Sequence, residues 1–143
     1  MEEQKNNSGN AVSSADNTPK VKGIGGIFFF SENTKEIKEW YVNNLGFEIN
    51  DWGSVSFEYR DLHKPEVIIP LQWNPFKKDS DYFAPSKKEF MINYRVQNIE
   101  GMVNNLKEKG IIVVDEITNY EGVGKFVHIM DAEGNKIELW EPE

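Results

Sequence analysis

Hydrophobic patterning in the first half of the chain predicts one helix among several strands. After Asn33, a helix N-cap with Glu36 three residues on, apolar residues recur every three or four positions, as along one face of a helix. Gly46 follows where a left-handed helix end is favoured. The predicted segments are the strand 23–31, the helix 33–45 with Ile37, Trp40, Tyr41 and Leu45 facing inward, and the strands 47–50, 55–59 and 66–73, where Pro70 indicates an edge or a bulge.

The second half predicts the same order of elements. A strand at 90–96 points alternate side chains to opposite faces, with Met91, Asn93 and Arg95 sharing one of them. The turn Asp131–Gly134 is typical of a hairpin, and it joins the strands 126–130 and 135–140. The remaining predicted segments are the helix 98–109 with Met102, Val103 and Leu106 inward, the strand 111–115, and a glycine-bearing loop at 119–124.

The two halves also repeat in sequence. Residues 26–33 align with 91–98, and 71–75 align with 138–142. The repeating unit is too long for a solenoid, and two copies are too few. The repeat therefore predicts a duplicated α+β unit. We therefore expect two tandem βαβββ modules in a single domain spanning 21–142. Module one is 21–75, the linker 76–89 and module two 90–142; because its aromatic residues Phe76, Tyr82 and Phe83 favour packing, we expect the linker to lie against the domain.

Composition narrows the classes of partner. Residues 1–20 contain no aromatic residue and few apolar ones, so we expect a disordered tail. Cysteine is absent, which excludes disulfides and thiolate chemistry. A net charge of −8 argues against nucleic acid as a partner, and no apolar run reaches the length needed to cross a membrane. The tail lacks the character of a signal or transit peptide, so we expect a cytoplasmic protein.

Several motifs in order resemble one known family. Trp40-Tyr41 ahead of Leu45-Gly46-Phe47, and the closing stretch from Asp131 to Leu139, are similar to the vicinal oxygen chelate superfamily. That group includes glyoxalase I, bleomycin- and fosfomycin-resistance proteins and extradiol dioxygenases. The resemblance covers about residues 21–142. It implies a curved mixed sheet whose concave side forms a cup for a ligand, as in glyoxalase-like proteins.

The resemblance also implies where a metal ion would bind. In metal-dependent members the ligands are His, Gln or Glu on the first and last strands of each module. The corresponding positions here are Gly26, Leu71, Met91 and Glu138, of which only Glu138 is a competent ligand. One carboxylate cannot supply the coordination of a hard divalent ion. We therefore expect no metal ligands and no cofactor, the minority alternative being a divalent metal at Glu138.

Glu138 and His128 are the candidate catalytic residues. Alternation places His128 on the cup side of its strand, and the tight turn brings it across from Glu138. The pair could form a carboxylate-oriented general base, or it could be only a structural hydrogen bond. Arg95 and Lys136 could bind an anionic group, whereas Trp73 and Trp140 either close the rims of the modules or stack on a ligand. The candidate ligand-binding residues are Met91, Asn93, Arg95, Trp73 and Phe28.

Three functions fit these residues. The leading hypothesis is a glyoxalase-like protein that binds a small organic molecule in the cup without the family's divalent metal. The first alternative is a lyase or isomerase of the glyoxalase I kind, using Glu138 as base with or without a metal. The second is an antibiotic-sequestering resistance protein with a cavity shared between two chains. We expect a homodimer, and the sequence leaves open whether the modules pair within one chain or between chains.

Overall fold

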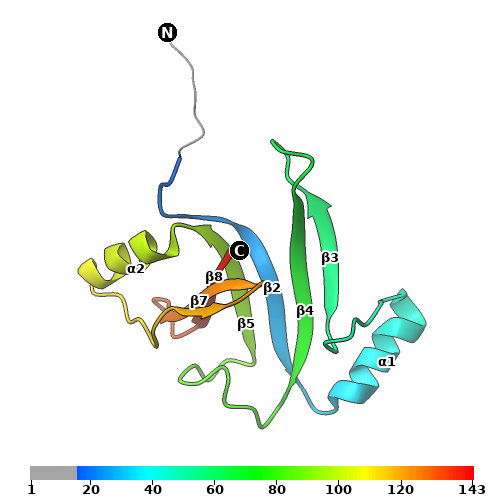
Figure 1. Cartoon of the computed structure of the whole chain (residues 1–143). Coiled ribbons are helices and arrows are strands. Elements are labelled where there is room, and N and C mark those ends of the chain that lie inside the picture. The colour runs from blue at the N-terminus through cyan, green and yellow to red at the C-terminus, as the bar shows by residue number, and fades with distance from the viewer. Residues whose placement is uncertain (1–15) are drawn as a thin grey trace.

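In the described part of the chain, seven strands form one mixed sheet in the order β3-β4-β2-β5-β8-β7-β6, and two helices accompany it (Figure 1). The structure is a computed structural model that describes residues 16–143. The predicted α+β fold, a curved sheet built from two modules, is confirmed. The elements are β2 (Lys20–Ser31), α1 (Thr34–Leu45), β3 (Val55–Arg60), β4 (Ile68–Lys77), β5 (Phe90–Gln97), α2 (Ile99–Glu108), β6 (Thr118–Tyr120), β7 (Gly124–Met130) and β8 (Lys136–Pro142).

The pair β2 and β5 joins the two modules at the centre of the sheet. These strands run antiparallel to each other, while β2 pairs in parallel with β4 and β5 pairs in parallel with β8. The first and last strands are therefore related in the same way within each module, as a duplication predicts. Most of the predicted tail lies outside the described residues. Its final residue, Lys20, already belongs to β2, and the carbonyls of Asn17 and Thr18 accept hydrogen bonds from Asn98 and Gln97.

Two predicted strands do not form. Residues 47–50 are an irregular segment, and 111–115 contribute only an isolated bridge between Val113 and Ile129. Phe47 is instead fixed by its ring, which packs on Trp73 with centroids 4.9 Å apart. Pro70 lies on an inner strand rather than an edge. The ladder between β4 and β2 begins at Gln72, so the missing N–H of Pro70 falls before it.

The helices cover one face of the sheet, and they cover it unequally. On α2 the predicted inward residues Met102, Val103 and Leu106 pack with strand residues around Val127 and Leu139, which confirms the prediction. Helix α1 begins and ends as predicted, since the Asn33 side chain accepts from the Glu36 N–H and Gly46 is left-handed. It has no buried residue, however.

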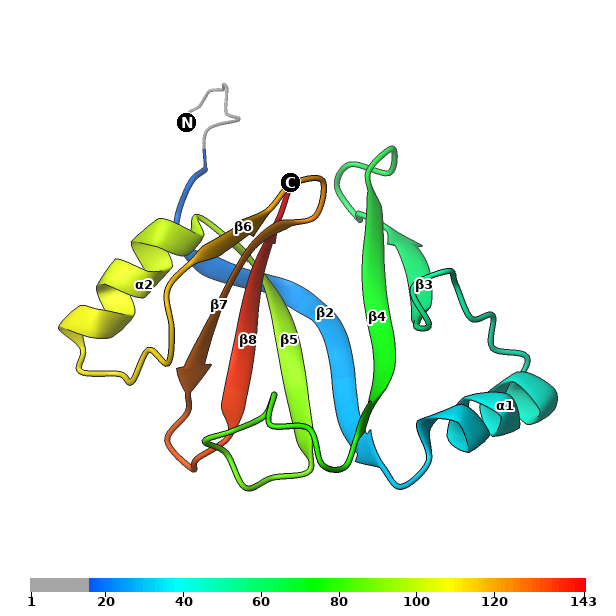
Figure 2. The ribbon, with the colours of Figure 1, turned by 60° about the horizontal axis from the view of Figure 1, so that its bottom comes forward.

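The inward stripe predicted for α1 is only half present. Ile37 and Tyr41 are half-buried, whereas Trp40 is 52% exposed and Leu45 58% exposed, so the prediction was wrong for the latter two. Beneath α1 the aromatic rings of Phe29, Tyr41 and Trp73 pack together. In Figures 1 and 2, α1 lies at the β3–β4 end of the sheet and α2 at the opposite end.

The opposite face of the sheet is the one on which the candidate residues lie, and we call it the cup face. Directly paired residues share a face, so the ladder defines it. Asn93 pairs with Glu138, and Glu138 with His128. In module one Phe28 and Gln72 belong to the same face, since Phe28 pairs with Met91 and Gln72 with Gly26.

The linker between the modules packs against the cup face, as its aromatic residues predicted. Phe83 is only 1% exposed and stacks on Phe30 with ring centroids 4.5 Å apart. It shares a buried cluster with Phe28 and Met91. The segment runs across the lower ends of β5 and β8 in Figure 2, and we call residues 78–89 the strap. Among the helices that the structure describes, none has the length and apolar character to cross a membrane.

Phe83 anchors the strap, so its removal is expected to destabilise the fold. Phe83→Ala leaves a cavity in a buried aromatic cluster, which costs about 3–5 kcal/mol of unfolding free energy. Phe90→Ala is the matched control, because Phe90 is 42% exposed and its truncation leaves no comparable cavity. Urea unfolding followed by fluorescence measures both variants. Equal losses in the two variants would contradict a buried anchor.

Candidate functional site

A row of polar side chains crosses the cup face at one level of the sheet. Each member pairs directly with the next strand's member, so the row is set by backbone register. It also corrects the positions inferred from the resemblance: Gln72 and Asn93, not Leu71 and Met91, lie level with Glu138. The row consists of Ser56, Gln72, Asn93, Glu138 and His128, and Gly26 occupies the position between Gln72 and Asn93.

Glu138 is a buried carboxylate surrounded by hydrogen-bond donors. Only 4% of the Glu138 surface is exposed. Asn93 Nδ2 donates to Oε1 at 2.7 Å, while Tyr82 Oη at 2.6 Å and His128 Nε2 at 2.8 Å lie on Oε2. Burial disfavours the charged form, but the hydrogen bonds from His128, Tyr82 and Asn93 outweigh it and lower the pKa of Glu138. Glu138 is therefore held as an anion.

His128 lies between two carboxylates. Its Nδ1 is 2.7 Å from Asp115 Oδ2 and its Nε2 is 2.8 Å from Glu138 Oε2, so each ring nitrogen faces an acceptor. Burial lowers the pKa of His128, but the hydrogen bonds to Glu138 and Asp115 prevail and raise it above its ordinary value. An imidazole with acceptors on both nitrogens is favoured as the imidazolium. The His128–Glu138 contact predicted across the hairpin is thus present, as an ion pair.

Tyr82 covers this ion pair from the strap. Its ring stacks on Phe76 with centroids 5.4 Å apart and meets the His128 ring edge-on at 5.3 Å. Lys136 Nζ donates to the Tyr82 carbonyl at 2.6 Å and lies 5.2 Å from the ring centroid. Burial and the Glu138 charge raise the pKa of the Tyr82 hydroxyl, which keeps it a donor. Access to Glu138 Oε2 from the strap side therefore requires Tyr82 to move.

The other predicted residues fall into three environments. Asn93 contacts Glu138, and Arg95 lies on the same face two residues further along β5. Met91 and Phe28 are buried beneath Phe83, at 0% and 9% exposed. Lys136 is buried, which lowers its pKa, and it contacts the strap rather than joining Arg95.

Trp73 does not belong to this site. Its ring packs against Tyr41 of α1 and Phe47, on the face opposite Glu138, because alternation along β4 puts Gln72 rather than Trp73 on the cup face. The repeat alignment had matched it to Trp140, which does lie on the cup face beside Phe126, with parallel rings 5.8 Å apart. This placement puts Trp73 outside the cup face, and its role in ligand binding stays a prediction.

Two residues of the site were missed. Asp115 lies in a segment predicted as a strand, and nothing in its spacing indicates a contact with His128. Tyr82 was assigned to the packed linker without a polar role. The adjacent aromatic pair Tyr82-Phe83 in an otherwise polar stretch was the available signal, since buried tyrosine hydroxyls usually find a partner.

The donors around Glu138 do not match the needs of a divalent cation. Gly26 offers no side chain, and the Gln72 amide donates to Ser56 Oγ at 3.2 Å. The Asn93 amide turns its NH₂ group, not its oxygen, to Glu138. Within residues 16–143, no cluster of three or more His, Cys, Asp or Glu side chains is arranged to hold a metal ion. Both oxygens of the Glu138 carboxylate, which a cation would need as ligands, already accept hydrogen bonds from protein groups.

A hollow of about 560 Å³ lies away from this site, between the end of α1 and β3. It is lined by residues 45–50 and 55–58, and it forms where α1 stands off the sheet. Its charged lining residues are Glu48 and Glu58, and Glu138, His128 and Tyr82 are not among the residues that line it. We therefore place the candidate site on the cup face.

The modules β2-α1-β3-β4 and β5-α2-β6-β7-β8 share one sheet, with a polar row across the face opposite the helices. The model of the Glyoxalase/Bleomycin resistance protein/Dioxygenase superfamily matches residues 23–139, and the chain belongs to this superfamily. No curated protein matches the chain in sequence.

Solved structures share the fold at low sequence identity. Methylmalonyl-CoA epimerase from Mycobacterium tuberculosis is 21% identical, with a TM-score of 0.53 over 92% of this chain and 93% of that one. A Streptomyces coelicolor methylmalonyl-CoA epimerase in complex with 2-nitronate-propionyl-CoA is 15% identical, with a TM-score of 0.62 over 86% and 99%. A superfamily member from Vibrio splendidus 12B01 is 15% identical, with a TM-score of 0.53 over 87% and 99%.

The ion pair gives the free energy of unfolding a maximum with pH. Because the pKa of His128 is raised from 6.5, its contribution is complete below pH 6.5 and is lost as pH rises through the folded-state pKa. Because the pKa of Glu138 is lowered from 4.5, its contribution is present above pH 4.5 and is lost as pH falls. The pair therefore stabilises most between these two values.

His128→Gln is expected to lose about 3–5 kcal/mol of unfolding free energy in that window, because it leaves buried Glu138 without its cation. The loss shrinks as the pH rises through the pKa of His128. Denaturant unfolding across the pH range measures it, with His63→Gln in the exposed 61–65 loop as the matched control. Parallel pH profiles for wild type and His128→Gln would contradict the ion pair.

Proposed function

We propose that this chain binds a small organic molecule on the cup face and holds no divalent metal ion there. The observation that carries the proposal is the set of three protein donors on buried Glu138. In a metal-dependent site the charge of such a carboxylate is balanced by the cation. Here His128 supplies the positive charge, and Tyr82 and Asn93 satisfy the remaining acceptors, so the carboxylate is stable without a metal.

Binding of an organic molecule is supported by polar atoms left without partners beside the ion pair. Asn93 Oδ1 and Arg95 Nε are buried and have no hydrogen-bond partner within residues 16–143. Buried polar atoms are nearly always satisfied, by protein, water or ligand. These two lie on the same face as Glu138. A solved structure of similar fold, 15% identical to this chain, is described in complex with 2-nitronate-propionyl-CoA.

The alternative of a lyase or isomerase requires Glu138 to accept a proton from a substrate. Its lowered pKa and three donors make it a weak base in the arrangement described. Such catalysis would require Tyr82 to leave Oε2 first. The antibiotic-sequestering alternative, the homodimer and the cytoplasmic location stay predictions.

The metal part is tested by titration. Isothermal titration of chelator-treated protein with Ni²⁺, Zn²⁺, Mg²⁺ or Mn²⁺ is expected to give no stoichiometric binding, and Glu138→Gln to leave the profile unchanged. Asp79→Asn, in the exposed part of the strap, is a control for weak surface binding. A stoichiometric, tight site that disappears in Glu138→Gln would sink the proposal.

The ligand part is tested by an NMR screen of ¹⁵N-labelled protein against small organic fragments. The indole N–H of Trp140, which donates to the Val123 carbonyl at 3.0 Å, reports on the cup face. That of Trp52, 92% exposed, is the control. We expect fragments that shift Trp140 and its neighbours on β5 but leave Trp52 unchanged. A screen that moves no cup-face resonance would contradict ligand binding, and product formation by a bound fragment would favour the enzyme alternative.

A further inference from the structure

Arg95 is held against the cup face by packing. It lies on β5 between Gly23 of β2 and Trp140 of β8, with which it pairs in the ladder. A Cβ added to Gly23 would come 2.6 Å from Arg95 Nη2, and one added to Gly25 would come 2.9 Å from Arg95 Cγ. The two glycines therefore give the arginine room to lie along the sheet. The guanidinium is placed by its surroundings rather than by a partner.

The guanidinium has no acidic partner among the described residues. No ion pair joins Arg95 to a carboxylate in residues 16–143, and its Nε is buried without a hydrogen bond. Burial lowers the pKa of Arg95, and Asp61 is the acid whose charge opposes this. Asp61 Oδ1 already accepts from the N–H groups of His63 and Lys64. An arginine held in place without an anion is suited to receive one.

An unpaired acceptor lies beside this cation. Asn93 is 2% exposed, and none of the residues 16–143 donates a hydrogen bond to its Oδ1. The orientation of the amide is fixed, because its Nδ2 donates to the Glu138 carboxylate, which accepts only. Oδ1 consequently faces Gly25 and the stem of Arg95. Along the cup face, the hydrogen-bonded carboxylate of Glu138 is followed by Asn93 Oδ1 and then by the Arg95 guanidinium. Within residues 16–143, Asn93 Oδ1 and Arg95 Nε have no hydrogen-bond partner.

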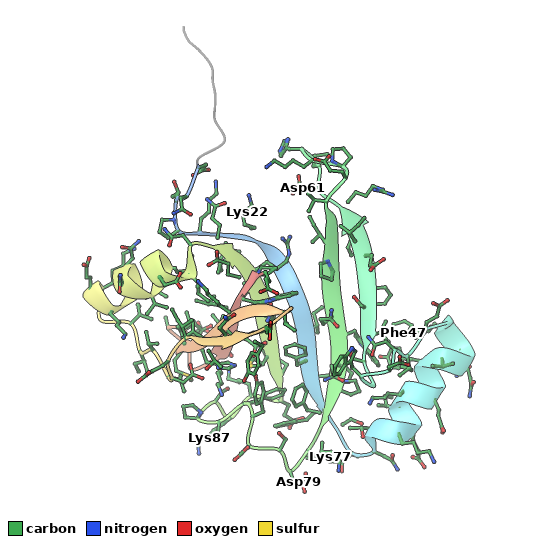
Figure 3. All side chains as sticks on the ribbon, in the orientation of Figure 1. Lys22, Phe47, Asp61, Lys77, Asp79 and Lys87 are labelled. Carbon is green, nitrogen blue, oxygen red and sulfur yellow. The ribbon has the colours of Figure 1, made fainter. Side chains whose placement is uncertain are left out.

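We propose that Arg95 binds the carboxylate of a small 2-hydroxy acid whose hydroxyl donates to Asn93 Oδ1. This inference rests on the proposed function and specifies its ligand. The direction of binding follows from charge, since Glu138 repels a carboxylate and its oxygens already hold three donors. Arg95 pairs with Gly23, the residue after Lys22 on β2. Figure 3 shows Lys22 and Asp61 at one end of the sheet, and Asp79 and Lys87 of the strap at the other.

The test compares lactate with its neutral amide, lactamide, by NMR titration of the full chain. We expect lactate to shift the Trp140 indole and the Arg95 side-chain Nε–H, and lactamide to bind at least about tenfold more weakly. Arg95→Gln is expected to weaken lactate binding by a similar factor. Arg60→Gln is the matched control, because Arg60 is the other arginine and donates to the Pro65 carbonyl at 2.8 Å.

Gly23→Ala tests the same site while keeping its charge. The added methyl displaces the guanidinium, so lactate binding weakens although Arg95 is present and the fold is kept. Unchanged lactate affinity in Arg95→Gln, or equal binding of lactamide, would overturn the inference. If the fragments of the earlier screen shift Trp140 but lactate does not, the carboxylate site is wrong and the proposed function survives. If no organic probe shifts Trp140, both fail.

Discussion

The burial of one carboxylate governs the arrangement of the cup face. An ionised side chain removed from water is stable only with compensating donors or charge. Glu138 receives these from three different elements: Asn93 on β5, His128 on β7 and Tyr82 in the strap. These hydrogen bonds therefore connect β5, β7 and β8 of module two, and they hold the strap against the cup face. A substitution that removes any one donor leaves a charge that the remaining residues must satisfy.

Membership of the superfamily defines the fold, whereas the chemistry must be inferred from the residues of the site. The site is not arranged as a free general base, because the pKa of Glu138 is lowered and its oxygens are occupied. Two of the positions level with Glu138 present no oxygen or nitrogen ligand in this arrangement, because Gly26 has no side chain and the Asn93 amide turns its NH₂ group to Glu138. The described part of the chain thus contains a charged, largely hydrogen-bonded centre beside two buried atoms without a hydrogen-bond partner, Arg95 Nε and Asn93 Oδ1.

The sequence predicted the contacts that local geometry determines and missed those that depend on register or loops. The His128–Glu138 pair was predictable, since a short turn fixes which residues oppose each other in a hairpin. The sequence did not predict that Gln72 and Asn93 lie opposite Gly26 and in line with Glu138. Irregularities between Val21 and Gly23 and between Ile24 and Gly26 shift the pairing of β2 with β5, and the sequence does not reveal them. Tyr82 and Asp115 reach the site from irregular segments, where no periodicity indicates which side chain turns inward.

Helix α1 packs less closely against the sheet than α2 does, so the two modules are not equally stabilised. With no residue of that helix buried, the amide groups of the helix are protected chiefly by their own hydrogen bonds, whereas α2 is fastened by Ile99 and Val103. The two modules thus differ in the free energy needed for local opening. The first copy is the one through which the chain can fluctuate while the charged centre, built entirely from the second copy and the strap, keeps its geometry.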